Sequence, residues 1–345
     1  MQRHDRRAGL YALALVLGSL ALLVLGAGVG STGFERVWAA REDAVAWQIV
    51  WEIRLPRTLG AWLVGALLGL AGAIAQGLFR NPLADPFLLG SASGASLGIA
   101  LALVMVGGSG GHMGSVLGAV APGSPWLLRI GLTGAAFVGA VAGVALTLAL
   151  ARGVQHTLRL LLAGVIVGVV LSASKDLITL AVPDILQAMQ GFTLGNTGFV
   201  GWASCLVLGT VWLPAMVLAW VLAPVLDGLS LGESTARSLG LPLAPVRAAL
   251  VAVLALATGT AVAQVGLIAF VGLAAPHLVR TLVVGTHGRL LWLSSLTGGL
   301  LLMAADLLAR WLIAPQELPV GVLTAVLGGS YLLWLMHRGT RGRVL

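Results

Sequence analysis

An uncharged run of 22 residues, Thr58 to Phe79, is the feature that most constrains how this chain can fold. A helix of about 20 apolar residues spans the roughly 30 Å hydrocarbon core of a bilayer. Similar apolar runs recur along the 345 residues, of which only 9% are charged, against about 25% in soluble domains. The sequence therefore predicts an all-α polytopic membrane protein.

Ten such runs predict about ten transmembrane helices in a single domain, residues 1–345. The first run has the basic start of a signal peptide, but the many spans behind it favour a retained helix. The seventh and eighth runs form either two spans or one broken unit, because Gly266, Gly272 and Pro276 interrupt them. The predicted spans are 8–30, 56–79, 87–106, 127–150, 157–181, 202–224, 246–266, 270–284, 289–313 and 319–337.

The distribution of basic residues predicts the orientation of these spans. With the N-terminus inside, 13 of the 20 Lys and Arg residues fall on the cytoplasmic side and 7 on the outer side, in the direction of the positive-inside rule. Both termini are then expected in the cytoplasm. The segment AIAQGL (73–78) recurs as AVAQVGL (261–267) in a span of opposite direction, which is consistent with an inverted internal repeat.

Glycines inside the apolar runs predict a tightly packed bundle. Small residues four apart let helix backbones approach closely where lipid supplies no hydrophobic drive for association. Four sets have this spacing: Gly65/Gly69, Gly90/Gly94/Gly98, Gly139/Gly143 and Gly164/Gly168.

Several classes of function are disfavoured by what the sequence lacks. The sole lysine, Lys175, follows no glycine-rich phosphate loop, so ATP hydrolysis is not expected in this chain. One cysteine and six histidines without paired spacing predict neither a disulfide nor a metal site, and we expect no cofactor. The net charge of +8 lies in loops and tails, which argues against nucleic-acid binding. An ion-coupled carrier, an alternative, would need mid-span carboxylates, which are scarce here.

Charged residues near the ends of two spans have two interpretations each. Arg54 and Arg57 lie three apart at the outer start of the second span. They either extend to the membrane interface or dock an acidic partner, since guanidinium groups suit carboxylates. Asp306 and Arg310 lie four apart in the ninth span, where they form either a self-neutralising pair or a functional group.

Three segments between the spans also stand out. The turn RNPLADP, residues 80–86, is polar and stiff between two apolar runs. Its Asn81 and Asp85 are expected to cap backbone groups at the helix ends. The cytoplasmic loop 225–245 reads as a short helix outside the membrane, and the outer segment 183–201 as a loop or short helix.

The stretch 54–98, RLPRTLGAWLVGALLGLAGAIAQGLFRNPLADPFLLGSASGASLG, resembles the FecCD-type permease family, the membrane subunits of bacterial ABC importers for ferric siderophores, haem and cobalamin. Four further blocks agree in order: LLLAG (160–164), LGESTARSLGL (231–241), GLIAFVGLAAPHLVR (266–280) and ADLLARWLIAPQELPVGVLTAVLGGSYLLWL (305–335). The resemblance covers nearly the whole chain beyond residue 50.

This resemblance implies a multi-pass subunit of the bacterial cytoplasmic (inner) membrane and a transport protein rather than an enzyme. The expected partners are a second copy in a homodimer, two cytoplasmic ATPase subunits, and one periplasmic or lipid-anchored substrate-binding protein. It also implies site residues. Docking of the binding protein falls to Arg54, Arg57 and Arg310. Segment 229–241 becomes the coupling helix for the ATPase, with Leu231, Gly232, Glu233, Arg237 and Leu239.

The turn at 80–86 would be a cytoplasmic gate, formed by Asn81, Pro82 and Leu83 and faced by Thr157; the alternative is an ordinary, well-capped turn. One departure is that Glu233 is followed by Ser234, where the family often has a second acid. The expected substrate is an iron chelate, with haem favoured over a ferric siderophore and cobalamin as the alternative, although no single residue decides between them.

Overall fold

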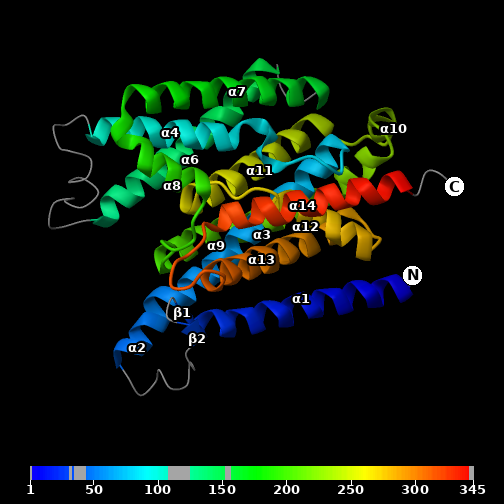
Figure 1. Cartoon of the computed structure of the whole chain (residues 1–345). Helices are drawn as coiled ribbons and strands as arrows, with labels where there is room; N and C mark the ends of the chain where they lie inside the picture. The colour runs from blue at the N-terminus through cyan, green and yellow to red at the C-terminus, as the bar shows by residue number, and fades with distance from the viewer. Residues whose placement is uncertain (1, 31–32, 35–43, 108–124, 152–156, 342–345) are drawn as a thin grey trace.

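The computed structural model describes residues 2–30, 33–34, 44–107, 125–151 and 157–341. Helices make up nearly all of this part of the chain and run side by side in one bundle (Figure 1). The α-helices are α1 (Gln2–Gly28), α2 (Ala44–Ile49), α3 (Leu55–Phe79), α4 (Ser91–Gly107), α6 (Pro125–Leu150), α7 (Thr157–Ala181), α8 (Leu186–Leu194), α9 (Trp202–Ser230), α10 (Glu233–Ser238), α11 (Leu243–Val265), α12 (Val271–Leu282), α13 (His287–Trp311) and α14 (Val320–Arg341).

Shorter elements connect these helices. A π-helix, η2 (Val50–Arg54), joins α2 to α3, and two 3-10 turns, η3 (Pro86–Leu89) and η4 (Pro183–Ile185), precede α4 and α8. The strands β1 (Val29–Gly30) and β2 (Gly33–Phe34) form a two-residue antiparallel pair in which Val29 lies opposite Phe34. The predicted outer segment 183–201 thus holds η4 and α8, and segment 229–241 holds α10.

Each of the ten predicted spans contains a helix, so the all-α prediction is confirmed. In the described part of the chain, seven helices are long and apolar enough to cross a membrane, and α4 and α14 are shorter apolar helices. The largest differences between predicted and observed bounds lie at the start of α1, which is Gln2 rather than residue 8, and at the end of α9, which is Ser230 rather than residue 224. The seventh and eighth runs are separate helices, α11 and the 12-residue α12, because the chain breaks at 266–270. The third span begins with η3 rather than α4.

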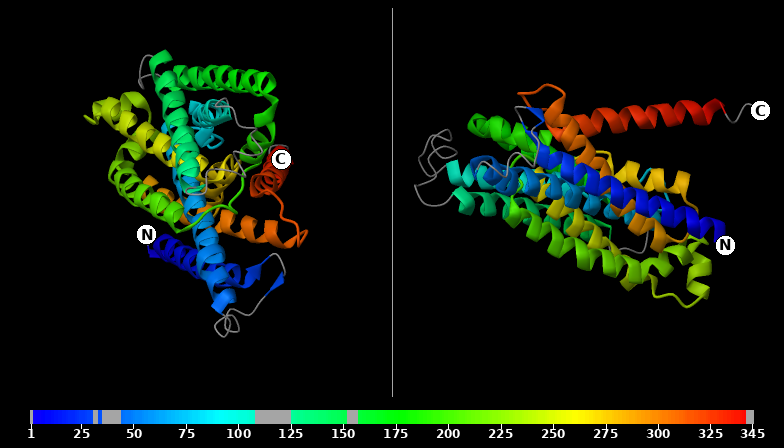
Figure 2. Two further views of the ribbon diagram at one scale, coloured as in Figure 1. Left: turned by 90° about the vertical axis from the view of Figure 1, so that its left-hand side faces the viewer. Right: turned by 90° about the horizontal axis from the view of Figure 1, so that it is seen from below.

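Helix α3 lies at the centre of the bundle. In its apolar window 89% of the residues are buried, against 6% for α1, which lies at the periphery. Figure 2 shows α3 surrounded by other helices while α1 runs along the outside. A helix that is apolar all round fits such a central place, and this explains the uncharged run from Thr58 to Phe79.

The predicted glycine sets lie where helix backbones meet. A Cβ atom on Gly65 would lie 2.2 Å from the backbone oxygen of Gly298 in α13, and one on Gly94 would lie 2.2 Å from the oxygen of Gly139 in α6. Because no side chain fits in these spaces, α3 packs directly on α13 and α4 directly on α6. The bundle therefore contains two tightly packed groups, α3 with α13 and α4 with α6.

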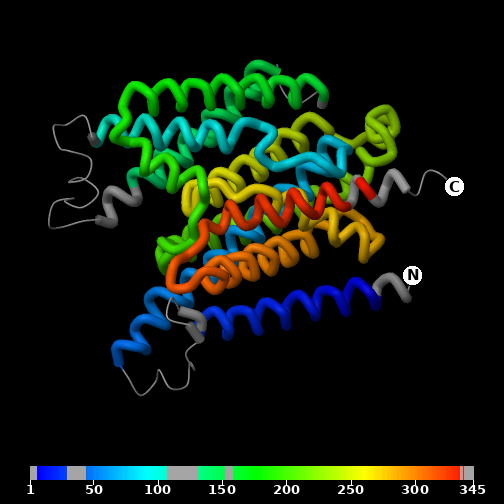
Figure 3. Tube along the Cα trace, in the orientation of Figure 1, coloured from blue at the N-terminus to red at the C-terminus, as the bar shows by residue number. Residues whose placement is uncertain are grey.

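The two ends of the bundle differ in what they carry. The N- and C-terminal ends of the chain lie at the same end as α10, and α2 and α8 lie at the opposite end (Figures 1 and 3). The arginine bias assigns the first end to the cytoplasm. These are called the cytoplasmic end and the outer end below.

Candidate functional site

A group of charged and hydroxyl side chains, buried except for Glu317, lies at the outer end, where α3, α13 and two loops meet. It consists of Arg57 of α3, Asp306 and Arg310 of α13, Thr197 of the α8–α9 loop and Glu317 of the α13–α14 loop. This set is called the outer cluster below. Two of its members are positive and two are negative, so the cluster as a whole is close to neutral.

Asp306 is the centre of the outer cluster and is fully buried. Its Oδ1 accepts hydrogen bonds from Nε of Arg57 at 3.3 Å and from Nη2 of Arg57 at 3.2 Å. The hydroxyl of Thr197 donates to the same oxygen, and Nη2 of Arg310 donates to Oδ2. The i,i+4 pair expected for Asp306 and Arg310 is therefore confirmed.

The remaining bonds extend the outer cluster to Glu317 and Thr58. Nη1 of Arg57 donates to both carboxylate oxygens of Glu317, at 3.0 and 2.8 Å. Nη2 of Arg310 donates to the hydroxyl of Thr58 at 3.3 Å, and that hydroxyl donates to the backbone oxygen of Arg54. Glu317 is the accessible member, with 34% of its side chain exposed.

The structure places the three docking candidates inside the subunit. Arg54 is 9% exposed, Arg57 is 8% exposed and Arg310 is 1% exposed. Charged groups in such surroundings need compensation, and for Arg57 and Arg310 the two carboxylates of the cluster supply it. From the sequence, Arg54 and Arg57 either dock a partner or extend to the membrane interface. Neither interpretation predicts that their side chains are buried.

At the cytoplasmic end, the turn at residues 80–86 shows one of its two predicted helix caps: Asp85 caps η3, whereas Asn81 bonds within the turn rather than to the end of α3. Oδ1 of Asn81 accepts from the backbone N–H of Leu83 at 3.0 Å, and Oδ1 of Asp85 accepts from that of Phe87 at 2.8 Å. Arg80 ends α3 in the left-handed conformation, with φ of 50°. Burial raises the pKa of Asp85 from its ordinary value, while the Phe87 N–H lowers it.

The turn packs against α12. A Cβ on Gly272 would lie 2.5 Å from Cγ of Pro86 and 2.9 Å from the backbone oxygen of Leu68, so α3, α12 and the turn meet at this glycine. Leu83 is 56% exposed. Thr157 is the first residue of α7, and its side chain lies outside the described residues.

A cavity of about 250 Å³ joins the turn to the end of α9. Nε2 of Gln76 donates to the backbone oxygen of Leu273, and Nη1 of Arg280 donates to the Gln76 side-chain oxygen. The lining residues are Gln76, Gly77, Arg80, Asn81, Pro82, Ser230, Arg280 and His287.

Hydrogen bonds between Asp227 and His287 fix α9 to α13 beside this cavity. Oδ1 of Asp227 accepts from the backbone N–H of His287 at 2.9 Å and lies 2.7 Å from the ring Nδ1. Asp227 lies three residues before Ser230, where α9 ends and the segment leading to α10 begins. The turn and the start of segment 229–241 therefore share one packed region.

Helix α10 is held against α11 by the ion pair between Glu233 and Arg247, while Arg237 pairs with Glu233 within α10. Oε2 of Glu233 lies 3.1 Å from Nη2 of Arg247, which is 3% exposed, and Oε1 lies 2.7 Å from Nη2 of Arg237. The hydrogen bond to Arg247 is the main cause that lowers the pKa of Glu233. Gly232 precedes the helix with φ of 107°, a conformation that other residues rarely adopt.

Several side chains of this segment face outward, and three of them are long. Leu231 is 65% exposed and Leu239 is 61% exposed, and 65% of the Arg237 side chain is exposed. Ala236 faces inward and is fully buried. The segment therefore presents two long apolar side chains and one cation at the cytoplasmic end. On its inner side, the carboxylate of Glu233 holds α10 to Arg247 of α11.

Sequence reasoning missed the residues that connect these sites. Each of these residues bonds to a partner at least 14 positions away in the chain. They are Thr197, Glu317, Asp227, His287 and Arg247. Gln76 carried a signal, because it is the one amide side chain in the run from Thr58 to Phe79. Among the described residues, no group of three or more His, Cys, Asp or Glu side chains could hold a metal ion.

Known proteins resemble this chain over nearly its whole length. Residues 13–338 match the model of the FecCD transport family. The hemin transport system permease protein HmuU of Yersinia pestis is 38% identical over 335 residues, which is 94% of this chain and 95% of that protein. The vitamin B12 import system permease protein BtuC of Salmonella paratyphi A is 39% identical over 332 residues, with the same coverage.

A solved structure also matches over nearly the full length. It is an inward-facing conformation of a metal-chelate type ABC transporter, with a TM-score of 0.82 and 28% identity, covering 95% of this chain and 98% of that one. The PsaBC complex of Streptococcus pneumoniae matches with a TM-score of 0.55 at 18% identity, covering 86% and 94% of the two chains, and so shares the fold alone.

Proposed function

Because this chain belongs to the FecCD transport family, we propose that it is the permease subunit through which an ATP-driven importer passes haem into the cytoplasm. The chain is a multi-pass protein of the bacterial inner membrane and a transport component rather than an enzyme. ATP hydrolysis belongs to a separate chain.

The observation that carries the substrate proposal is the full-length similarity to a hemin permease, at 38% identity. A second candidate is cobalamin, because the vitamin B12 permease is equally similar at 39%. Both substrates are metal complexes of a large macrocycle, so both belong in the test panel. A ferric siderophore remains the third member of the panel tested below.

The exposed side chains of the coupling segment support docking of an ATPase subunit there. Leu231 and Leu239 offer apolar contacts and Arg237 offers a charge. Glu233 acts as a positioning residue, because its carboxylate fixes α10 to the buried Arg247 of α11. A displacement of α10 would then be transmitted to the bundle through α9 and α11.

The turn at residues 80–86 would act as the cytoplasmic gate. The cavity that it shares with Ser230 and His287 provides a route by which displacement of the coupling segment would shift Asn81 and Pro82. The turn lies between the two tightly packed groups, α3 with α13 and α4 with α6. Movement of one group relative to the other would therefore open or close the path at Leu83, with Thr157 at the start of α7 on its far side.

Docking of a binding protein would use the outer cluster by exchange of carboxylates. Glu317 is the half-exposed partner of Arg57, and an acidic side chain of the incoming protein would take its place. Such an exchange would release the α13–α14 loop from Arg57. The incoming carboxylate would contact Arg57 and Arg54, and Arg310 would respond through Asp306, to which both Arg57 and Arg310 donate.

The exposed apolar face of α7, with Leu162, Val169 and Leu180, supports a homodimer.

Transport into proteoliposomes tests the proposal. The vesicles would contain this chain with its neighbouring ATPase and binding protein, and the panel would be haem, cobalamin and several ferric siderophores, with and without ATP. We expect haem to accumulate only with ATP and the binding protein. If only cobalamin accumulates, cobalamin rather than haem is the substrate. If transport does not depend on ATP but follows an ion gradient, the proposal of an ATP-driven importer is refuted.

A further inference from the structure

A large cavity that the proposed transport function does not use lies between α6, α9 and α11, in the outer half of the bundle. Its volume is about 560 Å³, within the roughly 300–1,000 Å³ range of small-molecule sites. Most of its wall is apolar, with Phe137 of α6, Val207 and Val211 of α9, and Ala263 of α11. None of the described residues that line it carries a charge. It is called the lateral cavity below.

The mouth of the lateral cavity lies at the outer interface of the membrane. Gly201, at the start of α9, lines it, and the ring of the neighbouring Trp202 packs against Trp51 with 5.2 Å between the ring centroids. Tryptophans gather at membrane–water interfaces. From Gly201 to Val211 the cavity follows α9 for about 15 Å, at about 1.5 Å per residue, which is half of the roughly 30 Å hydrocarbon core. It therefore covers the depth of one leaflet.

The lateral cavity opens sideways to lipid. Val138 of α6, next to Phe137, is 66% exposed, and Leu206 of α9, next to Val207, is 70% exposed. Exposed apolar side chains of membrane-spanning helices contact acyl chains, which are equally apolar. Helix α7, whose exposed face supports the homodimer, contributes no residue to this wall. The expected occupant is therefore a component of the membrane rather than a second copy of the chain.

The apolar wall also holds polar side chains that lack a partner in the described part of the chain. Thr260 of α11 is 3% exposed, and its hydroxyl is fully buried and unbonded. By contrast, the hydroxyl of Thr258 donates to the backbone oxygen of Leu254. A hydroxyl enclosed in hydrocarbon without a partner is costly, so the cavity suits an apolar ligand that brings a hydrogen-bond acceptor. Three more side chains of the wall bond to no described protein group: Thr133, Ser204 and Gln264.

We propose that the lateral cavity binds one acyl chain of an outer-leaflet phospholipid, together with the ester carbonyl that joins this chain to glycerol. The chain lies along Phe137, Val207 and Val211. Thr260 and Gln264 are four positions apart on one face of α11, and both donate to the carbonyl oxygen. A threonine in a helix has two accessible rotamers, so a rotation about the Cα–Cβ bond of Thr260 brings its hydroxyl into the cavity. Because the described wall is uncharged, the site selects for the ester and not for the headgroup.

Lipid titration followed by native mass spectrometry tests the site on the full chain in detergent. The probes are phosphatidylcholine with two ester-linked chains and phosphatidylcholine with two ether-linked chains, which lack the carbonyl. We expect wild type to bind the ester lipid about five-fold more tightly, as one hydrogen bond implies. Thr260→Val keeps the shape of the side chain and should abolish this preference. Phosphatidylglycerol with ester-linked chains should bind as phosphatidylcholine does.

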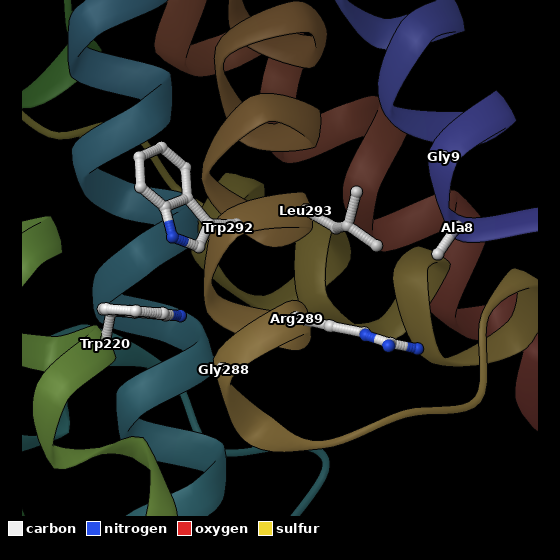
Figure 4. A pocket seen from close by; sticks show the side chains of 7 residues that line it. All are labelled: Ala8, Gly9, Trp220, Gly288, Arg289, Trp292 and Leu293. Atoms are coloured by element: carbon white, nitrogen blue, oxygen red, sulfur yellow. The ribbon is translucent and has the colours of Figure 1, made fainter. Parts of the chain in front are cut away.

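Gly134 of α6 allows the lateral cavity to be filled without disturbing the fold. A Cβ on this glycine would meet no atom within 4 Å, so Gly134→Leu should fold normally and weaken binding of the ester lipid about ten-fold. Gly9 of α1 supplies the matched control. Figure 4 shows it beside another cavity, which lies at the cytoplasmic end and contains Arg289, and a Cβ there would also meet no atom within 4 Å. Gly9→Leu should leave the ester preference unchanged.

A crosslink in native membranes identifies the occupant directly. Replacing Val207 with the photoreactive residue benzoylphenylalanine places the reactive group in the wall of the lateral cavity, and we expect the product to carry the mass of a phospholipid. Three results would each overturn the proposal. They are equal binding of ester and ether lipids to wild type, unchanged binding to Gly134→Leu, and a crosslink to a second copy or to another protein instead of lipid.

Discussion

Replacing Asp306 by asparagine should destabilise the protein by about 3–5 kcal/mol, the usual cost of removing one member of a buried ion pair. Asp306 is fully buried, and both Arg57 and Arg310 donate to its carboxylate. Two opposite charges about 4 Å apart interact by about 4 kcal/mol at an effective dielectric constant of about 20. The carboxylate makes two such pairs, and its own desolvation offsets several kcal/mol of this attraction.

Thermal unfolding in detergent would measure this loss. At about 2 °C per kcal/mol for a chain of this size, Asp306→Asn should lower the midpoint by roughly 6–10 °C. Adding Arg310→Met should recover part of the loss, because the second substitution removes a cation that the first leaves uncompensated, while Arg57 keeps Glu317.

Asp184 provides the control, because it is an exposed aspartate of η4 at the same end of the bundle. Asp184→Asn should change stability by no more than about 0.5 kcal/mol. If Asp306→Asn and Asp184→Asn both have the same unfolding midpoint as the wild type, the outer cluster does not hold α13 to α3 and the reasoning is refuted.

Three further predictions concern the coupling segment and the packing of α3. The lowered pKa of Glu233 means that its contact with Arg247 is complete above the ordinary value of 4.5 and is lost as pH falls through the lower value in the folded protein. Hydrogen exchange of 233–238, corrected for intrinsic rates, should therefore speed up only below pH 4.5, and pH-independent protection would contradict this. Replacing both Leu231 and Leu239 by serine should weaken ATPase binding at least ten-fold in a pull-down titration, whereas Leu282→Ser, also exposed, should not. Gly298→Leu should prevent folding, since a Cβ there would lie 2.2 Å from a backbone oxygen of α3, and a normal yield of folded protein would show that the helices can separate.

The sequence predicted those features that depend on local patterns. The helices of the ten spans follow from apolar length, the contacts of Gly65 and Gly94 from four-residue spacing, and the cap of η3 by Asp85 from its side-chain chemistry. The Asp306–Arg310 pair was also within reach, because both residues lie on one helix four positions apart.

The features that the sequence could not predict arise from contacts between distant segments. Arg57 and Asp306 are separated by 249 positions, and Asp227 and His287 by 60. Nothing in the local pattern around Arg57 distinguishes an arginine at a membrane interface from one buried beside two carboxylates. The sequence marks the break at Gly266 but not the long-range contact made there, in which the backbone N–H of Leu267 donates to the backbone oxygen of Phe192 in α8.

The central position of α3 has a consequence for how the protein is made. This helix is the second span to leave the ribosome, yet the helix that covers its glycine face is the ninth. The bond from the Ser295 hydroxyl to the backbone oxygen of Ala66 joins residues 229 positions apart. During synthesis, the bare backbone of α3 therefore stays in contact with lipid or an insertase until α13 arrives. Nascent chains that stop before residue 287 lack this partner and present that surface to the quality-control proteases of the membrane.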